Sequence, residues 1–248
     1  MPMATFRFHG SLNHFLPAER REAEIAYRFE AEPGVKDAIE ALGVLHPEVD
    51  LILAGGRSVG LDHRVKADDS IEVFGLDRPD RLAARPGLIP SPPDPRCFVL
   101  DGHLGRLARY LRMLGFDSAY DRAAGDDELA RISAEEGRIL LTRDRGLLKR
   151  SIVRLGYLVR DDDPRRQLVE VVGRYGLAER AHPFSRCVRC NGEIEAVERS
   201  EVAERLAGEP RTLRSFEAFG RCRACGSIYW QGSHFDRMSR LVEEVVRG

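Results

Sequence analysis

Two short apolar runs, each followed by an aspartate, constrain the fold of this chain most strongly. The first is Phe98–Leu100, which ends at Asp101, and the second is Arg138–Thr142, which leads through Arg143 to Asp144. Short apolar runs bounded by turn residues are typical of buried strands, and a helical pattern begins directly after Asp101. Strands that alternate with helices predict a parallel sheet, and ligands bind outside the carboxyl ends of its strands. We therefore expect Asp101 and Asp144 to stand at a ligand-binding edge of that sheet.

Residues 1–77 predict a separate small domain in the order strand, strand, helix, strand, strand. Alternating apolar residues mark the first two strands, Pro33-Gly34 precedes the helix, and Gly55-Gly56 marks a tight turn. This order and the turn Ala54–Arg57 resemble a ubiquitin-like β-grasp domain of the sulfur-carrier type. Sulfur carriers end in a free Gly-Gly tail, whereas here the chain runs on past Gly75. A docking or solubilising module is therefore favoured over sulfur transfer.

A proline-rich stretch, residues 78–95, separates this front domain from the rest of the chain. Proline fixes φ and disfavours helices and central strands, which predicts a semi-rigid linker. Residues 96–180 then carry the alternating strands and helices, including helices over 104–114, from Asp126, and from Asp163-Pro164 to Gly176. Residues 181–248 form a third segment that contains paired cysteines and a last amphipathic helix.

Two Cys-x-x-Cys pairs give the most specific signal in the sequence. Cys187 and Cys190 form the first pair, Cys222 and Cys225 the second, and 31 residues separate the pairs. Two such knuckles complete a tetrahedral shell of four thiolates, which selects zinc and leaves no open position. We therefore expect a structural zinc site. A redox dithiol and an iron-sulfur centre are the alternatives.

Three aspartates are the candidates for a second metal site. Asp101 and Asp144 end two predicted parallel strands, and Asp126 begins a helix that packs on the same sheet. Carboxylates that meet at one edge repel one another unless cations neutralise them, and hard oxygen ligands suit Mg²⁺ or Mn²⁺. Each aspartate has the alternative role of a cap or turn residue, and for Asp126 an N-cap explains the residue unaided. Asp127 is an alternative to Asp126, and the further acids that follow a strand are Asp161 and Asp162.

Basic residues accompany these acids. Residues 1–77 hold 8 basic and 14 acidic residues, so the remainder of the chain carries a net positive charge although the whole chain is at −1. Arg106, Arg109 and Arg112 lie three apart and form a basic stripe on the helix after Asp101, and Arg143 precedes Asp144. Arginine suits phosphate binding, so Arg106, Arg109 and Arg143 are candidate substrate contacts. A solvated helix face is the alternative explanation of the stripe.

Several of these residues together look like the Mut-seven C-terminal RNase family. They are the run Asp101–Gly115, the strand that ends in Thr142-Arg143-Asp144, and the paired cysteines with Tyr229-Trp230 and Gly232-Ser233-His234. The resemblance covers roughly residues 96–240, and the front domain matches the β-grasp unit often fused to this family. The family is similar to PIN-domain nucleases with an attached zinc ribbon. It implies an α/β fold whose parallel sheet is flanked by helices, an N-terminal β-grasp domain and a C-terminal zinc ribbon.

The resemblance also implies a function. Asp101, Asp126 and Asp144 would be the metal-binding acids of a PIN-like site, although the usual set of four acids is not plainly complete in this sequence. We expect a ribonuclease that hydrolyses single-stranded RNA with Mg²⁺ or Mn²⁺ and holds Zn²⁺ structurally. The alternative is a non-catalytic RNA-binding or adaptor protein. A protein partner would bind through the β-grasp domain. No membrane span or signal peptide is evident in the sequence, so a cytoplasmic location is expected.

Overall fold

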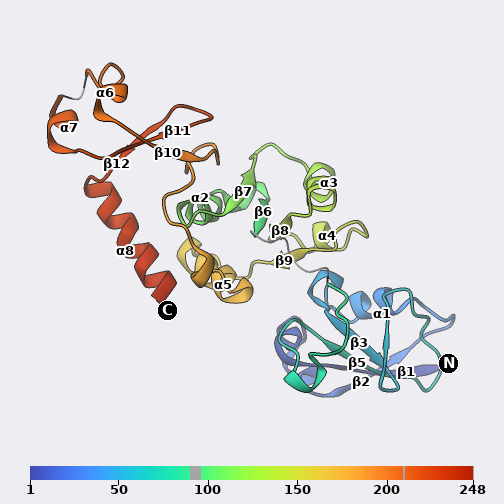
Figure 1. Ribbon diagram of the computed structural model, residues 1–248. Helices are drawn as coiled ribbons and strands as arrows, with labels where there is room; N and C mark the ends of the chain where they lie inside the picture. The colour runs from blue at the N-terminus through green and yellow to red at the C-terminus, as the bar shows by residue number, and fades with distance from the viewer. Residues whose placement is uncertain (90–95, 209, 248) are drawn as a thin grey trace. The chain divides into compact units, whose positions relative to one another are not determined.

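The computed structural model describes residues 1–89, 96–208 and 210–247 (Figure 1). The chain forms two compact units. One comprises residues 1–92 with 130–158, and the other comprises residues 93–129 with 159–248.

The first 77 residues fold as a five-stranded β-grasp sheet with one α-helix. The strand order is β2-β1-β5-β3-β4, and β1 runs parallel to β5 while its partner β2 is antiparallel. Fully buried side chains from the strands and the helix, among them Phe6, Phe8, Ile39 and Val73, form the core. The elements are β1 (Met3–Phe8), β2 (Glu24–Arg28), α1 (Val35–Ala41), β3 (Leu51–Ala54), β4 (Arg57–Val59) and β5 (Ser70–Phe74). The strands and the helix predicted here are present, and β4 is an additional strand that the prediction lacked.

Short 3-10 helices connect these strands and continue into the proline-rich stretch. They are η1 (Gly10–Phe15), η2 (Ala18–Arg20), η3 (His46–Glu48) and η4 (Asp80–Leu82). Residues 78–89 pack on the β-grasp domain: Arg78 pairs with Asp50 at 3.3 Å, and the Leu88 N–H donates to the Asp50 carbonyl. The end of the predicted linker, residues 90–95, lies outside the described residues.

The β-grasp domain also contacts the strand pair β8 (Ile139–Thr142) and β9 (Gly156–Leu158) of the same compact unit. His46 Nε2 lies 2.9 Å from the Val153 carbonyl oxygen, and Leu158 N donates to the Glu48 carboxylate at 3.1 Å. His46 and Glu48 are both buried. These contacts join η3 to β9 and to the segment before it, so the β-grasp domain packs on this strand pair.

Residues 96–180 contain a four-stranded sheet with the order β7-β6-β8-β9. Strand β6 (Cys97–Leu100) is parallel to β7 (Asp117–Tyr120), and β8 is parallel to β9. The helices are α2 (Gly105–Met113), α3 (Asp126–Glu136), α4 (Arg145–Leu148) and α5 (Pro164–Tyr175), with 3-10 helices η5 (Gly102–Leu104) and η6 (Ala178–Arg180). The predicted parallel α/β arrangement is therefore present.

Local sequence signals explain where these helices begin and end. Leu107, Ala108 and Leu111 are fully buried on one face of α2. Gly115, with φ of +93°, follows the end of that helix, as its freedom to adopt positive φ predicts. The Asp163 carboxylate accepts hydrogen bonds from two backbone N–H groups at the start of α5. Helix α3 differs from the prediction, because it begins at Asp126 itself rather than after an Asp126 cap.

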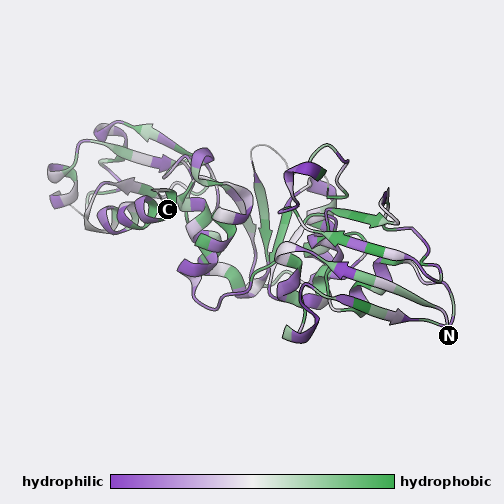
Figure 2. Cartoon of the chain, turned by 90° about the horizontal axis from the view of Figure 1, so that it is seen from below, coloured by the Kyte–Doolittle hydropathy of each residue, from purple (hydrophilic) through white to green (hydrophobic). Residues whose placement is uncertain are grey.

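The last segment is a three-stranded antiparallel sheet followed by a long helix. Strands β10 (Ile194–Val197), β11 (Phe219–Cys222) and β12 (Ile228–Trp230) pair in the order β10-β11-β12. Val202, Leu206 and Phe219 form its small core. Helices α6 (Arg199–Val202) and α7 (Pro210–Ser215) lie between the cysteine pairs, and α8 (Ser233–Arg247) follows β12. Figure 2 shows that the helix leading to the C-terminus carries both hydrophilic and hydrophobic residues, as an amphipathic helix does.

No helix within the described ranges combines the length and apolarity that a membrane crossing requires.

Candidate functional site

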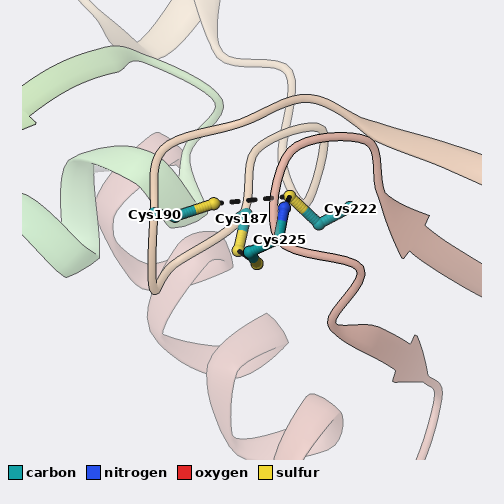
Figure 3. Close-up of side chains that lie close together, drawn as sticks. All are labelled: Cys187, Cys190, Cys222 and Cys225. Carbon is teal, nitrogen blue, oxygen red and sulfur yellow. Dashed lines mark hydrogen bonds between the residues drawn. The ribbon is translucent and has the colours of Figure 1, made fainter.

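The four predicted cysteine ligands lie together. Their sulfur atoms are all within 4.8 Å of one another, and Figure 3 shows the four side chains pointing toward a common centre. The Sγ atoms of Cys190 and Cys222 are 3.4 Å apart, and those of Cys187 and Cys225 are 3.6 Å apart. A tetrahedral zinc with Zn–S bonds of about 2.3 Å places its sulfurs about 3.8 Å apart. The spacing and the donor chemistry therefore fit a structural zinc ion.

The two knuckles repeat one backbone pattern. In the first, the Asn191 N–H donates to the Cys187 carbonyl and Asn191 has φ of +70°. In the second, the Gly226 N–H donates to the Cys222 carbonyl and Gly226 has φ of +69°. The tight turn directs both sulfurs of each pair to one side, and its left-handed residue is a glycine or an asparagine, the types that best tolerate this conformation.

The electrostatics of the thiols favour binding of a cation. Hydrogen bonds from the Ser227 side chain and backbone lower the pKa of Cys225 to about 6. The Gly192 backbone acts to lower the pKa of Cys190, but burial and hydrogen bonds with the other three thiols raise it to about 12. Burial acts to raise the pKa of Cys187, but hydrogen bonds with Tyr229 and the knuckle backbone lower it. Thiolates at Cys187 and Cys225 are therefore favoured, whereas one at Cys190 is disfavoured while no cation balances the negative charge. A dication removes that penalty.

Tyr229 contributes to this centre from β12. Its hydroxyl lies 2.9 Å from Cys187 Sγ, and burial followed by the hydrogen bond with Cys187 raises the pKa of the phenol. A neutral hydroxyl is thus held against a ligand sulfur, where it can donate to a thiolate. Trp230 packs on the small core of the ribbon. The sequence did not indicate this polar contact. The signal that could have found it is a phenol four residues after Cys225.

The first knuckle is attached to the end of α2 and to β7. The prediction that Arg112 shares an accessible stripe with Arg106 and Arg109 is wrong, because its side chain is 4% exposed. It donates to the carbonyls of Ser118, Val188 and Arg189 at 2.9, 3.3 and 3.1 Å. The Asn191 side chain accepts from Ser118 N at 2.9 Å and donates to Asp117 at 2.8 Å. The ribbon is therefore fixed to the parallel-sheet segment by polar contacts that the sequence did not indicate.

The predicted acids each stand where an element begins. Asp101 follows β6, is 6% exposed, and accepts from His103 N at 2.8 Å. Asp144 follows Thr142 and Arg143 at the end of β8, and accepts from Gly146 N at 2.6 Å. Asp126 is an exposed residue in the first turn of α3. Both strand-end carboxylates thus have the capping role given above as the alternative, and their meeting at one metal site remains a prediction.

The remaining candidates are distributed as follows. Arg106 and Arg109 are exposed on α2, and Arg143 is exposed after β8. Asp161 is half-buried, accepts from Asp163 N and lies 3.9 Å from Arg166, while Asp127 and Asp162 are exposed. All three arginines are therefore on the surface, and Asp161 is engaged in local structure.

Comparison with known protein families gives a match for the N-terminal domain and another for the rest of the chain. The sequence pattern of the Mut7-C RNAse domain matches residues 96–242, and that of the Mut7-C ubiquitin domain matches residues 1–81. The comparisons with curated proteins and with solved structures gave no match. The first pattern covers more than half of the chain, including the parallel sheet, Asp101, Asp144 and all four clustered cysteines. The chain therefore belongs to the Mut7-C RNAse family and carries that family's ubiquitin-like domain at its N-terminus.

Proposed function

We propose that this protein is a metal-dependent ribonuclease that cleaves phosphodiester bonds of single-stranded RNA. The observation that carries the proposal is the match of the RNAse pattern across residues 96–242. That range includes a parallel sheet whose strands β6 and β8 are followed by Asp101 and Asp144, at strand ends where α/β proteins bind ligands.

In this proposal Asp101, Asp126 and Asp144 hold Mg²⁺ or Mn²⁺. Carboxylate oxygens are the donors that these hard cations prefer. When bound, such an ion activates water and stabilises the leaving oxygen of a phosphodiester. The protein's part is to fix the acids: a hydrogen bond from His103 N orients the Asp101 carboxylate, and one from Gly146 N orients that of Asp144. Arg106, Arg109 and Arg143 hold the phosphates of the strand.

The test replaces Asp101 and Asp144 by asparagine and measures cleavage of a labelled single-stranded RNA with Mn²⁺ or Mg²⁺. Asparagine keeps an oxygen that can accept the same backbone N–H but removes the charge, so the local fold is preserved. We expect cleavage to fall by on the order of 100-fold or more in each variant.

Asp163→Asn is the matched control, because Asp163 caps α5 through the same kind of backbone hydrogen bonds and is not one of the proposed ligands. It should cleave within a few-fold of the wild type. Full activity in both Asp101→Asn and Asp144→Asn would overturn the assignment.

A non-catalytic RNA-binding or adaptor protein is the second candidate. The capping hydrogen bonds at Asp101 and Asp144 favour it, because they account for both acids without a metal. Salt-dependent RNA binding without cleavage in either metal would support this alternative. In both cases the ubiquitin-like domain is the proposed site for a protein partner.

A further inference from the structure

A groove lined by arginines lies among α2, α5, α8 and the first cysteine knuckle, all within one compact unit. Its volume is about 280 Å³. Arg109 comes from α2, Arg165 from the first turn of α5 and Arg237 from α8. Three elements far apart in the sequence thus each place a cation on the same groove.

The charge of this groove is of one sign. Its described lining residues include three arginines and no aspartate or glutamate. Three guanidinium groups on one groove produce a positive potential there, and a positive potential attracts an anionic ligand.

The floor of the groove is apolar. Met113, Val188 and Met238 line it, and Met113 is 2% exposed. Tyr110 is half-buried and presents an aromatic ring beside them. Methionine adapts to ligands of irregular shape, and aromatic rings stack on unpaired bases. A ligand that matches both parts must carry an anionic group next to a flat, weakly polar one.

We propose that this groove binds one nucleotide of single-stranded RNA, a subsite that rests on the ribonuclease function proposed above. The phosphate lies against Arg109, Arg165 and Arg237, and the base lies over the methionines and Tyr110. A volume of about 280 Å³ lies just below the range of roughly 300–1,000 Å³ that is typical of ligand pockets. It suits one unstacked nucleotide and excludes a double helix. The subsite holds the strand through Arg109, which the sequence had identified, and through two arginines that it had not.

The experiment measures binding apart from cleavage. Full-length, zinc-loaded protein is titrated into a fluorescently labelled oligouridylate in buffer without Mg²⁺ or Mn²⁺, and anisotropy gives the dissociation constant. The single variants Arg109→Gln, Arg165→Gln and Arg237→Gln should each weaken binding about tenfold. Each should also reduce the slope of log K against log salt concentration by about 0.7, because one phosphate contact is lost.

Two arginines serve as matched controls because they share the helices but do not line the groove. Arg240 lies on α8, where its side chain donates to the Asp236 carbonyl, and Arg166 lies next to Arg165 on α5, 3.9 Å from Asp161. Arg240→Gln and Arg166→Gln should bind like the wild type. All five side chains are exposed, so circular dichroism and zinc content should not change.

Wild-type binding by all three groove variants, or equal losses in the two controls, would overturn the proposal. So would equal competition by a double-stranded RNA or an acidic peptide, since the groove would then recognise charge alone. Failure of the proposed ribonuclease function would be distinguishable. In that case the wild type would not cleave RNA, while the groove variants would still bind RNA more weakly than the two controls.

Discussion

Replacement of Arg112 by methionine tests whether the zinc ribbon and the parallel-sheet segment form one cooperative structure. The Arg112 guanidinium donates to three backbone carbonyls, one in β7 and two in the first knuckle. Burial lowers the pKa of the guanidinium, with Cys187 and Cys190 acting in the opposite direction, but an arginine with so high an ordinary pKa remains charged. Methionine keeps most of the aliphatic stem and removes all of the donors.

The magnitude follows from the geometry of these bonds. The contacts to the Ser118 and Arg189 carbonyls, at 2.9 and 3.1 Å, are within good hydrogen-bond range, whereas that to Val188 is longer at 3.3 Å. A hydrogen bond from a charged donor contributes about 1.5–3 kcal/mol. Two such bonds at the lower value give about 3 kcal/mol for the loss in free energy of unfolding. The knuckle carbonyls would also lose their anchor, so zinc should leave the variant faster.

The assay is urea-induced unfolding of the full chain, together with zinc release to a colorimetric chelator. Arg112→Lys retains the charge but spans fewer acceptors, so its stability should fall between those of the wild type and Arg112→Met. Arg106→Met on the same helix is exposed and should change stability by no more than about 0.5 kcal/mol. A loss below about 1 kcal/mol for Arg112→Met, with zinc released at the wild-type rate, would refute this account of the attachment.

Two further predictions concern the metal and the front domain. Elemental analysis should find one zinc per chain, which Cys187→Ser should lose and the control Cys97→Ser should keep. A wild-type protein that is stably folded when purified free of zinc would contradict the structural role of the metal. At Glu40, burial raises the carboxyl pKa, but the hydrogen bond from His46 and the charge of Lys36 outweigh this and hold it below its ordinary value of 4.5. The stability that this carboxylate contributes should be fully present above pH 4.5 and be lost as the pH falls through the lowered value. Glu40→Gln should therefore show a shallower acid dependence of the unfolding free energy, and an unchanged slope would count against the His46 contact.

The elements that could be predicted from sequence are those whose causes are local. The buried face of α2, the Asp163 cap of α5 and the Gly176 end of that helix depend on residues a few positions apart. Strand β4 was missed because its three residues are mostly exposed and polar, and it becomes a strand by pairing with β3. The Gly55-Gly56 turn, with φ of +53° and +79°, is a two-residue hairpin signal that could have predicted that pairing.

The candidate sites divide in the same way. Cysteine spacing predicts the four-cysteine site because each Cys-x-x-Cys knuckle is a local turn. Two such turns supply the four thiolates that one tetrahedral zinc ion needs. The contacts that attach the cluster, such as Arg112 to the knuckle carbonyls and Tyr229 to Cys187, join residues at least 42 positions apart. No periodicity or motif encodes such pairs, because many arginines and tyrosines along the chain have the same local setting. Arg165 and Arg237 were missed for the same reason.

The β-grasp domain and the zinc ribbon, the two accessory domains, also contact the outer strands of the four-stranded sheet, β9 and β7 respectively. Strands at the ends of a sheet present unpaired backbone groups that invite association with other chains. At β9, Leu158 N donates to the buried carboxylate of Glu48 in the β-grasp domain. At β7, Ser118 N donates to the Asn191 side chain of the first knuckle, and the Ser118 carbonyl accepts from Arg112. The β-grasp domain and the ribbon thus each satisfy one backbone N–H of a different outer strand with a side chain, whereas Arg112 of α2 satisfies the Ser118 carbonyl. On this argument, removal of either domain would expose a sheet edge as well as delete a binding module.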